Sequence, residues 1–151
     1  MKILLTGATG YIGHRMIPHL VNEGHEVYCC TRNADRREDA FQESPQVHML
    51  QVDFLDNSTL NVIPEDIDAA YYLIHSMSVS KGEFEEMEEK CALNFTERLN
   101  QTHAKQVIYL SGITNESELS RHLQSRKNVE EILASGTFHL TTLRAGIIVG
   151  S

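Results

Sequence analysis

The segment from residue 6 to residue 13, which reads TGATGYIG, constrains this chain more than any other because a glycine recurs in it at every third position. An apolar run precedes the segment and apolar residues at helical spacing follow it, so it is predicted to join a strand to a helix. Gly7 can adopt the positive φ that closes a tight turn, Gly10 lets backbone amides approach a ligand, and Gly13 lets the helix pack closely on the sheet. Because the first N–H groups of a helix attract anions, the segment predicts a site for a nucleotide pyrophosphate. The alternative is a structural turn with no ligand.

Strand and helix patterns alternate along the whole chain. Strands are predicted over residues 2–6, 26–31, 47–52, 69–74, 106–110 and 138–143. Helices are predicted over residues 11–23, 33–42, 82–102 and 117–134, with a short one after the N-cap Asp56. Gly24 is expected to end the first helix and Pro18 to kink it. The alternation is typical of the α/β class, and right-handed crossovers then give a Rossmann-type doubly wound parallel sheet of about six strands with helices on both faces.

Length, charge and cysteine content narrow the class of protein. The 151 residues suffice for one domain, and a formal net charge of −8 argues against nucleic acid, which needs a basic surface. No apolar run approaches the roughly 20 residues that cross a bilayer. With no signal peptide pattern either, we expect no membrane association and a cytoplasmic location. Cys29, Cys30 and Cys91 lie in apolar stretches without metal-ligand spacing, so buried free thiols and no metal site are expected.

Acidic residues gather over residues 83–89, where the longest predicted helix begins. Negative charge near a helix N-terminus is stabilising, so this run is predicted to be a solvated face, with a partner-binding surface as the alternative. The apolar side of the same helix is marked by Phe84, Met87, Cys91, Phe95 and Leu99.

The glycine-rich segment resembles the TGxxGxxG signature of extended and atypical short-chain dehydrogenases/reductases, a superfamily that includes nucleoside-diphosphate-sugar epimerases and NmrA-like proteins. The resemblance covers the whole chain, because VD at residues 52–53, LSG at 110–112 and LRAG at 143–146 are similar to later motifs of the superfamily. It implies that residues 1–151 form an NAD(P)-binding Rossmann domain. The turn residues that it implies for cofactor binding are Gly7, Thr9, Gly10, Tyr11, Ile12 and Gly13.

The end of the second predicted strand bears on which dinucleotide is bound. NAD-binding domains usually carry an acid there, which accepts hydrogen bonds from the ribose hydroxyls. This chain has Arg32 and no acid until Asp35. A guanidinium pairs with a 2′-phosphate, so NADP is favoured, with NAD as the alternative. Arg36 and Arg37 can reinforce the site; otherwise these arginines are solvated surface charges.

Three more residues are implied to face the cofactor. Asp53 stands where the superfamily's acid receives the adenine amino group, and Phe54 can flank the adenine ring. The alternative for Asp53 is that it caps the following turn. His75 follows the fourth strand, at the edge that faces the nicotinamide half. It is either an acid–base group or a hydrogen-bonded packing residue.

The superfamily's catalytic tyrosine, four residues before a lysine, is missing from the helix that should carry it. Aligning SRHLQSRKNVE at residues 120–130 with the superfamily's pattern puts His122 at the tyrosine position and Arg126 at the lysine position. An arginine can hold a ribose hydroxyl but does not lose its proton. His122 is either the proton-transferring group or an exposed helical residue. Ser111 matches the serine that orients a substrate carbonyl.

In the superfamily, the substrate-binding part begins after the sixth strand, close to where this sequence stops. We therefore expect a fragment without its C-terminal substrate-binding part, catalytically silent alone and self-associating through its sixth-strand region. Two functions follow for the complete protein. One is an NADP-dependent oxidoreductase or sugar-nucleotide epimerase-like enzyme with an unknown small-molecule substrate. The other is a non-catalytic NmrA-like module that senses the dinucleotide.

Overall fold

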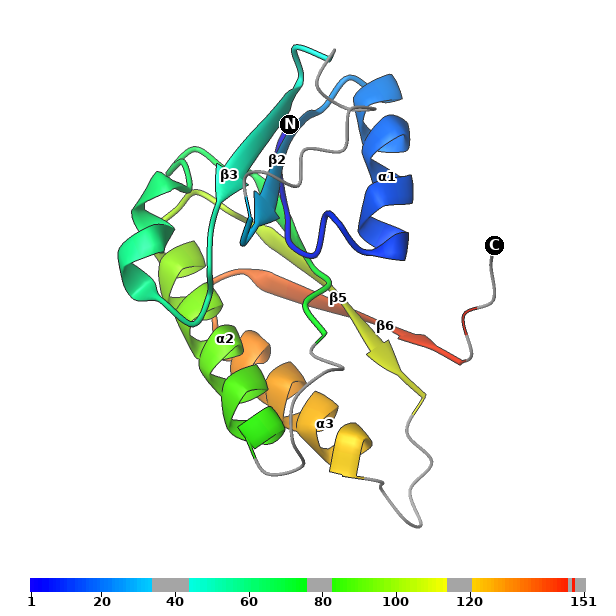
Figure 1. The fold of residues 1–151 in the computed structure, drawn as a ribbon, viewed down its shortest axis with the longest axis vertical. Coiled ribbons are helices and arrows are strands. Elements are labelled where there is room, and N and C mark those ends of the chain that lie inside the picture. The colour runs from blue at the N-terminus through cyan, green and yellow to red at the C-terminus, as the bar shows by residue number, and fades with distance from the viewer. Residues whose placement is uncertain (34–43, 76–82, 114–120, 147, 149–151) are drawn as a thin grey trace.

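The computed structural model describes residues 1–33, 44–75, 83–113, 121–146 and 148. The strands in this part of the chain are β1 (Lys2–Leu5), β2 (Glu26–Thr31), β3 (Val47–Gln51), β4 (Ala69–Tyr72), β5 (Gln106–Gly112) and β6 (His139–Ala145). They form one sheet in the order β3-β2-β1-β4-β5-β6, and every neighbouring pair is parallel (Figure 1). This order is that of the doubly wound dinucleotide-binding sheet, so the predicted Rossmann-type fold is confirmed.

The direction of winding reverses between β1 and β4. Leu5, the last residue of β1, pairs with Cys29 of β2 on one side and with Tyr71 of β4 on the other. Thr6 follows directly and is fully buried. Its hydroxyl donates to the Tyr71 carbonyl (3.0 Å) and accepts from the Leu73 N–H (2.9 Å). Thr6 therefore links β1 to the end of β4 where the strand order reverses. Ligands of open α/β sheets bind at such a reversal.

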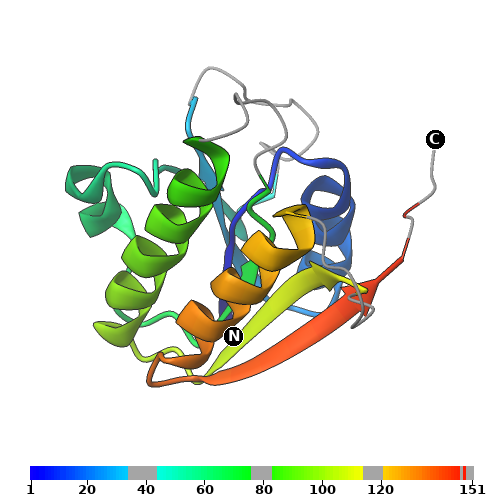
Figure 2. The ribbon, with the colours of Figure 1, turned by 90° about the horizontal axis from the view of Figure 1, so that it is seen from below.

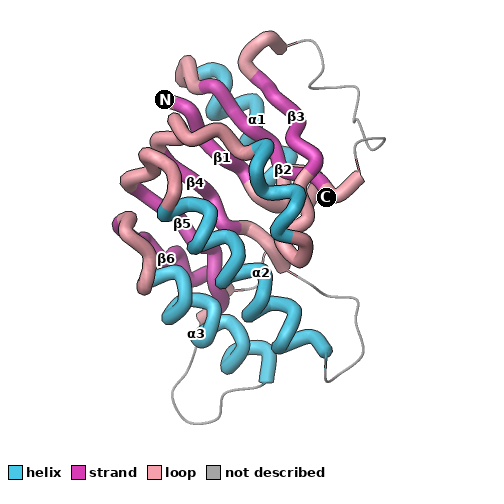
Figure 3. Tube along the Cα trace, turned by 90° about the vertical axis from the view of Figure 1, so that its left-hand side faces the viewer, coloured by secondary structure: helices cyan, strands magenta, loops and turns pink. Residues whose placement is uncertain are grey.

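Helices cover both faces of the sheet, as predicted. The helices are α1 (Tyr11–Asn22), α2 (Glu83–Asn100), α3 (Arg121–Ala134) and the 3₁₀-helix η2 (Asn57–Val62). α2, α3 and η2 lie over the larger core on one face, while α1 lies over the smaller core on the other (Figures 2 and 3). In the larger core, Tyr72 and Phe95 meet edge to face with 4.8 Å between ring centroids. In the smaller core, Ile17 of α1 packs with Leu5 and Val27.

α1 ends in the way that its sequence predicts. Gly24 adopts a φ of +80°, which glycine alone adopts without strain. The His25 N–H donates to the Leu20 carbonyl (3.1 Å) and the Gly24 N–H to the Val21 carbonyl (2.9 Å). This pair of bonds is a Schellman cap, so the predicted glycine stop is confirmed. The helix continues past Pro18, where the expected kink stays a prediction.

β5 and β6 reach further than the local pattern predicts. They pair over their whole length, from Gln106 opposite His139 to Gly112 opposite Ala145. The predicted strands stopped two residues earlier, because pairing between strands is invisible in the periodicity of either one. The helix predicted over 33–42 lies almost wholly outside the described residues, as do residue 82 and residues 117–120 of two others.

The short helix after Asp56 is confirmed and is a 3₁₀-helix. The Asp56 carboxylate accepts from the Ser58 N–H (3.0 Å) and caps it. Within the described part of the chain, no helix is long and apolar enough to cross a membrane.

The three cysteines are buried and free, as predicted. Burial raises the pKa of the Cys29 thiol to about 12 and that of Cys91 to about 11, and it raises the pKa of Cys30 as well. The thiolate is the reactive form, so these side chains serve the core as small apolar groups.

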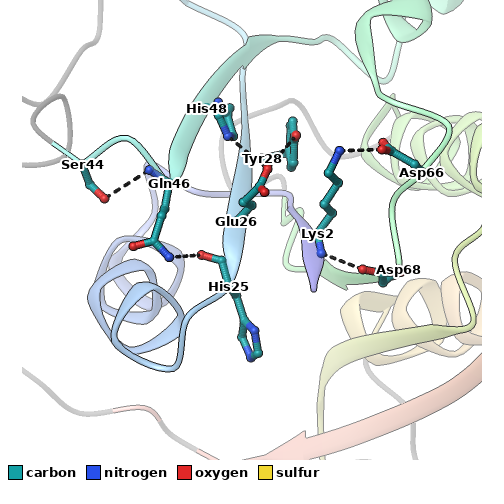
Figure 4. A network of polar contacts seen from close by, with 9 residues as sticks. All are labelled: Lys2, His25, Glu26, Tyr28, Ser44, Gln46, His48, Asp66 and Asp68. Atoms are coloured by element: carbon teal, nitrogen blue, oxygen red, sulfur yellow. Dashed lines mark hydrogen bonds and ion pairs between the residues drawn. The ribbon is translucent and has the colours of Figure 1, made fainter.

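A polar network joins the strands at the end of the sheet where they begin (Figure 4). The backbone N–H of Lys2 donates to the Asp68 carboxylate at 2.7 Å, and the side-chain ammonium of Lys2 pairs with the Asp66 carboxylate at 2.5 Å. The hydrogen bond between these two side chains raises the pKa of Lys2 and lowers the pKa of Asp66. Tyr28 of β2 stacks on His48 of β3 with 4.6 Å between ring centroids. These contacts hold the sheet together at the end opposite the glycine-rich turn.

Candidate functional site

A cavity of about 1200 Å³ lies at the C-terminal ends of the strands. It brings together twelve of the thirteen residues predicted from the sequence to form the site: Gly7, Thr9, Gly10, Tyr11, Ile12, Gly13, Arg32, Asp53, Phe54, His75, Ser111 and Arg126. The thirteenth, His122, lies on α3, but its side chain is outside the described residues. The motifs that are far apart along the chain therefore meet at one place in the fold.

The glycine-rich turn depends on close approach between backbone segments. Gly7 has a φ of +63°, and a Cβ there would stand 2.8 Å from the Leu73 carbonyl oxygen. The Gly10 N–H closes the turn by donating to the Gly7 carbonyl at 2.9 Å. A Cβ on Gly13 would overlap that same carbonyl oxygen and approach Ala8. The nearest neighbours of Gly13 are therefore the backbone atoms of the turn, a role different from the helix-on-sheet packing predicted for it.

The start of α1 offers hydrogen-bond donors to an anion. The first helical bond runs from the His14 N–H to the Gly10 carbonyl at 2.9 Å. The N–H groups of Tyr11, Ile12 and Gly13 come before it, and the opening turn of a helix has no intrahelical acceptors for them. These residues line the cavity, and the first turn of α1 carries no acid. The positive end of the helix dipole therefore faces the cavity without a competing carboxylate.

At the β2 end of the cavity stands an exposed arginine. Arg32 follows β2 directly and lines the cavity. The turn beyond the strand is held by Thr31, whose hydroxyl donates to the Asn33 carbonyl (3.1 Å) and accepts from the Asn33 N–H (3.3 Å). Arg36 and Arg37, which were predicted to reinforce binding of the 2′-phosphate, lie outside the described residues.

Asp53 and Phe54 follow β3 and have structural contacts as well as places in the cavity wall. The Asp53 carboxylate accepts from the Leu55 N–H at 3.0 Å. This contact caps the following turn, which was the alternative to the predicted adenine contact of Asp53. Phe54 is 5% exposed and packs against Phe95 with 5.6 Å between ring centroids. Most of the Phe54 ring therefore belongs to the core, and its contact with an adenine ring stays a prediction.

A connected set of polar side chains lies at the β4 end of the cavity. His75 places Nδ1 3.2 Å from Oε1 of Glu88 and Nε2 3.0 Å from Nη2 of Arg126. The other oxygen of Glu88 accepts from the Ser125 hydroxyl at 2.6 Å. Arg126 is also held through its backbone, because the Tyr109 hydroxyl donates to its carbonyl at 3.3 Å. His75 is thus hydrogen-bonded through both ring nitrogens. Arg126, which the sequence alignment placed at the superfamily's lysine position, lies in the cavity wall.

Glu88 is the site residue that the sequence reasoning missed. It belongs to the acidic run predicted to be solvated, yet it is only 4% exposed, so that prediction is wrong for this residue. Helical spacing was the available signal, because Glu88 precedes the apolar residues Cys91, Phe95 and Leu99 by three, seven and eleven positions. Such spacing puts a residue on the buried side of the helix whatever its charge.

Ser111 and Tyr109 line the cavity from β5. Ser111 is buried, consistent with a hydroxyl fixed in place. Burial raises the pKa of Tyr109, while a hydrogen bond with Ser111 acts in the opposite direction. Tyr109 therefore stays a neutral phenol near pH 7 and acts as a hydrogen-bond donor.

A parallel sheet in this order, with a glycine-rich turn at its reversal, defines a dinucleotide-binding Rossmann domain. Residues 7–147 match the family model described as NAD(P)H-binding, and the chain belongs to that family. It is an NAD(P)-binding domain resembling those of short-chain dehydrogenases/reductases and nucleoside-diphosphate-sugar epimerases, as its sequence predicted.

Solved structures share this fold at low sequence identity. A nucleoside-diphosphate-sugar epimerase from Staphylococcus aureus has a TM-score of 0.79 at 16% identity, over 95% of this chain and 50% of that one. WbmG of Bordetella bronchiseptica, in complex with NAD and UDP, has a TM-score of 0.76 at 15% identity, over 94% and 52%. A mutant UDP-glucuronic acid 4-epimerase from Bacillus cereus, in a complex containing NAD, has a TM-score of 0.75 at 19% identity, over 95% and 56%. This chain spans about half the length of these proteins.

Substitutions at two glycines separate ligand binding from stability. A Cβ on Gly10 meets only the Gly7 carbonyl oxygen, at 3.2 Å, so Gly10→Ala is expected to cost less than about 1 kcal/mol of folding free energy. It crowds the amides that face the anion, and NADPH affinity is expected to fall at least about tenfold. Gly24→Ala, strained by its positive φ, is expected to cost roughly 1–2 kcal/mol and to leave affinity unchanged. Thermal unfolding and calorimetric titration measure both, and unchanged NADPH affinity in Gly10→Ala would contradict the assignment.

Proposed function

We propose that this chain binds NADP(H) in preference to NAD(H), as the cofactor domain of an oxidoreductase that acts on a small molecule. The observation that carries the preference is Arg32, an exposed guanidinium at the end of β2 that lines the same cavity as the glycine-rich turn. An acid there would repel a 2′-phosphate, whereas a guanidinium forms charge-assisted hydrogen bonds with it. Between the end of β2 and Asp35 the sequence carries no acid.

The glycine-rich turn, which lines the cavity, supports the proposal where the pyrophosphate is expected. A Cβ at Gly7 would crowd the Leu73 carbonyl oxygen, and one at Gly13 would overlap the Gly7 carbonyl oxygen. The turn therefore requires close approach between backbone segments. In the proposal, the N–H groups at the start of α1 bind the pyrophosphate and Arg32 binds the 2′-phosphate. Asp53 accepts from the adenine amino group, and Phe54 flanks the ring.

On the other side of the turn, an arginine, a serine and a histidine act at the nicotinamide end. The bound nicotinamide donates or accepts a hydride. Arg126 binds the nicotinamide ribose in place of the superfamily's lysine, and the Ser111 hydroxyl orients the reacting group of the substrate. His75 or His122 moves the proton, since the catalytic tyrosine of the superfamily has no counterpart at residue 122.

A second function is supported by that same missing tyrosine. A domain that keeps the nucleotide site and loses the proton-transferring group suits an NmrA-like sensor of the cofactor. Assay of the complete protein for NADPH oxidation over a panel of carbonyl compounds separates the two. Turnover that His75→Ala or His122→Ala abolishes supports the oxidoreductase, and tight NADPH binding without turnover supports the sensor.

Removal of the Arg32 guanidinium tests the dinucleotide preference. At about 100 times its dissociation constant, a ligand adds roughly 2.7 kcal/mol to stability, a shift of several degrees in the unfolding midpoint. NADPH is expected to give a larger shift than NADH at equal concentration. Arg32→Gln is expected to weaken NADPH about tenfold or more and to leave NADH unchanged, because only the 2′-phosphate contact is lost. Lys105→Gln, an exposed cation just before β5, is the matched control. NADH binding tighter than NADPH in the unchanged chain would overturn the preference.

We also propose that the chain self-associates through its sixth-strand region. β6 is the last strand in the sheet order. Leu143 in β6 is 51% exposed, and Ile113, which follows the neighbouring β5, is 53% exposed. An open strand edge with exposed apolar side chains favours pairing with a second copy. Light scattering is expected to show a mass that rises from one chain toward two with concentration, and Leu143→Lys to lower it. A single-chain mass at every concentration would rule this out.

A further inference from the structure

The contacts of His75 determine where its proton lies. A guanidinium has five N–H donors and no acceptor, so the 3.0 Å contact with Arg126 requires Nε2 of His75 to accept. An imidazole whose Nε2 accepts carries its proton on Nδ1, and that N–H points to Oε1 of Glu88 at 3.2 Å. The bonds therefore run in one direction, from Arg126 to His75 and from His75 to Glu88.

Glu88 is placed to impose this direction. Its side chain is 5% exposed, and a buried carboxylate is costly unless donors surround it. Its donors include the Ser125 hydroxyl of α3 at 2.6 Å and the His75 ring at 3.2 Å. A carboxylate can only accept from both, so Glu88 selects the Nδ1–H form of His75 and leaves Nε2 with its lone pair toward Arg126.

Arg126 is thereby held at two points. The Tyr109 hydroxyl bonds its backbone carbonyl, and His75 bonds one guanidinium nitrogen. The single bond to His75 uses one of five donors, so the guanidinium keeps capacity for a further acceptor. Arg126, His75 and Glu88 all line the cavity, on the side of the glycine-rich turn away from Arg32.

We propose that Glu88 is the positioning residue of this site: acting through His75, it aims the Arg126 guanidinium at a ligand oxygen in the cavity. The ligand named here, the ribose at the nicotinamide end of the dinucleotide, rests on the proposed function. The hydrogen-bond direction does not rest on it. Glu88 and Ser125 touch no ligand in this arrangement, and their effect reaches the ligand only through His75 and Arg126.

Nitrogen-15 NMR of the histidine rings tests the hydrogen-bond direction without any ligand. The His75 signals are identified among those of the eight histidines by their loss in His75→Asn. In the unchanged chain, at a pH where the ring is neutral, His75 is expected to be protonated at Nδ1 and unprotonated at Nε2. Glu88→Gln is expected to lower the fraction of the Nδ1–H form, because the charge that favours it is gone. The Nε2–H form in the unchanged chain would overturn the proposal.

Titration with a whole and a half ligand tests the effect on Arg126. Glu88→Gln is expected to weaken NADPH about tenfold and to leave adenosine 2′,5′-bisphosphate unchanged, because the half ligand does not reach Arg126. Glu86→Gln, an exposed acid on the same helix, is the matched control and is expected to change neither affinity. Equal NADPH affinity in Glu88→Gln and the unchanged chain, or loss of both ligands together, would contradict positioning.

Ser125→Ala and the NMR measurement cover a variant that does not fold and a chain that does not bind. If Glu88→Gln does not fold, Ser125→Ala removes one donor from the same carboxylate and is expected to weaken NADPH in the same direction. If the unchanged chain binds neither NADPH nor the half ligand, the proposed function fails, and the NMR result alone decides whether Glu88 sets the state of His75.

Discussion

The close approach of the glycine-rich turn to the end of β4 is the constraint on which the rest of the structure depends. Gly7 sits against the Leu73 carbonyl in a backbone conformation with positive φ, and Thr6 beside it bridges the same two strands with its buried hydroxyl. The chain then enters α1 with its first N–H groups directed to the cavity. A Cβ at Gly7 would meet the Leu73 carbonyl oxygen at 2.8 Å and so push β1 away from β4 at the reversal of the sheet, where the cavity lies.

The two sides of the cavity are built differently. On the β2 side, Arg32 is exposed, so its charge is available to a ligand that arrives from solvent. On the β4 side, Arg126 bonds to His75, and a buried carboxylate on α2 stands behind both. The exposed side suits recognition of a charged group, whereas the supported side suits the fixed placement of one. In the proposed function, the exposed side binds the 2′-phosphate and the supported side binds the ribose at the nicotinamide end.

The absence of the superfamily's tyrosine from residue 122 does not leave the site without ordered polar groups. The contacts among His75, Glu88, Ser125 and Arg126 link the end of β4 to α2 and α3, so the packing of these helices and the geometry of the site are one problem. Burial of Glu88 costs free energy that a leucine in its place would not. We interpret that cost as the requirement for a single orientation of His75 and Arg126.

The sequence by itself determined the alternation of strands and helices, the glycine-rich turn and the motif residues at the strand ends, because each rests on local backbone preference or short spacing. Periodicity predicted the strand ends less well, since β5 and β6 are extended by their pairing with each other. Helical spacing places Glu88 on the buried side of its helix, but only the tertiary structure decided that its carboxylate lies beside His75. That contact joins residues 13 positions apart, and the one to Ser125 joins residues 37 apart. Such separations leave no periodic signal, so packing of α2 and α3 on the sheet had to bring these side chains together.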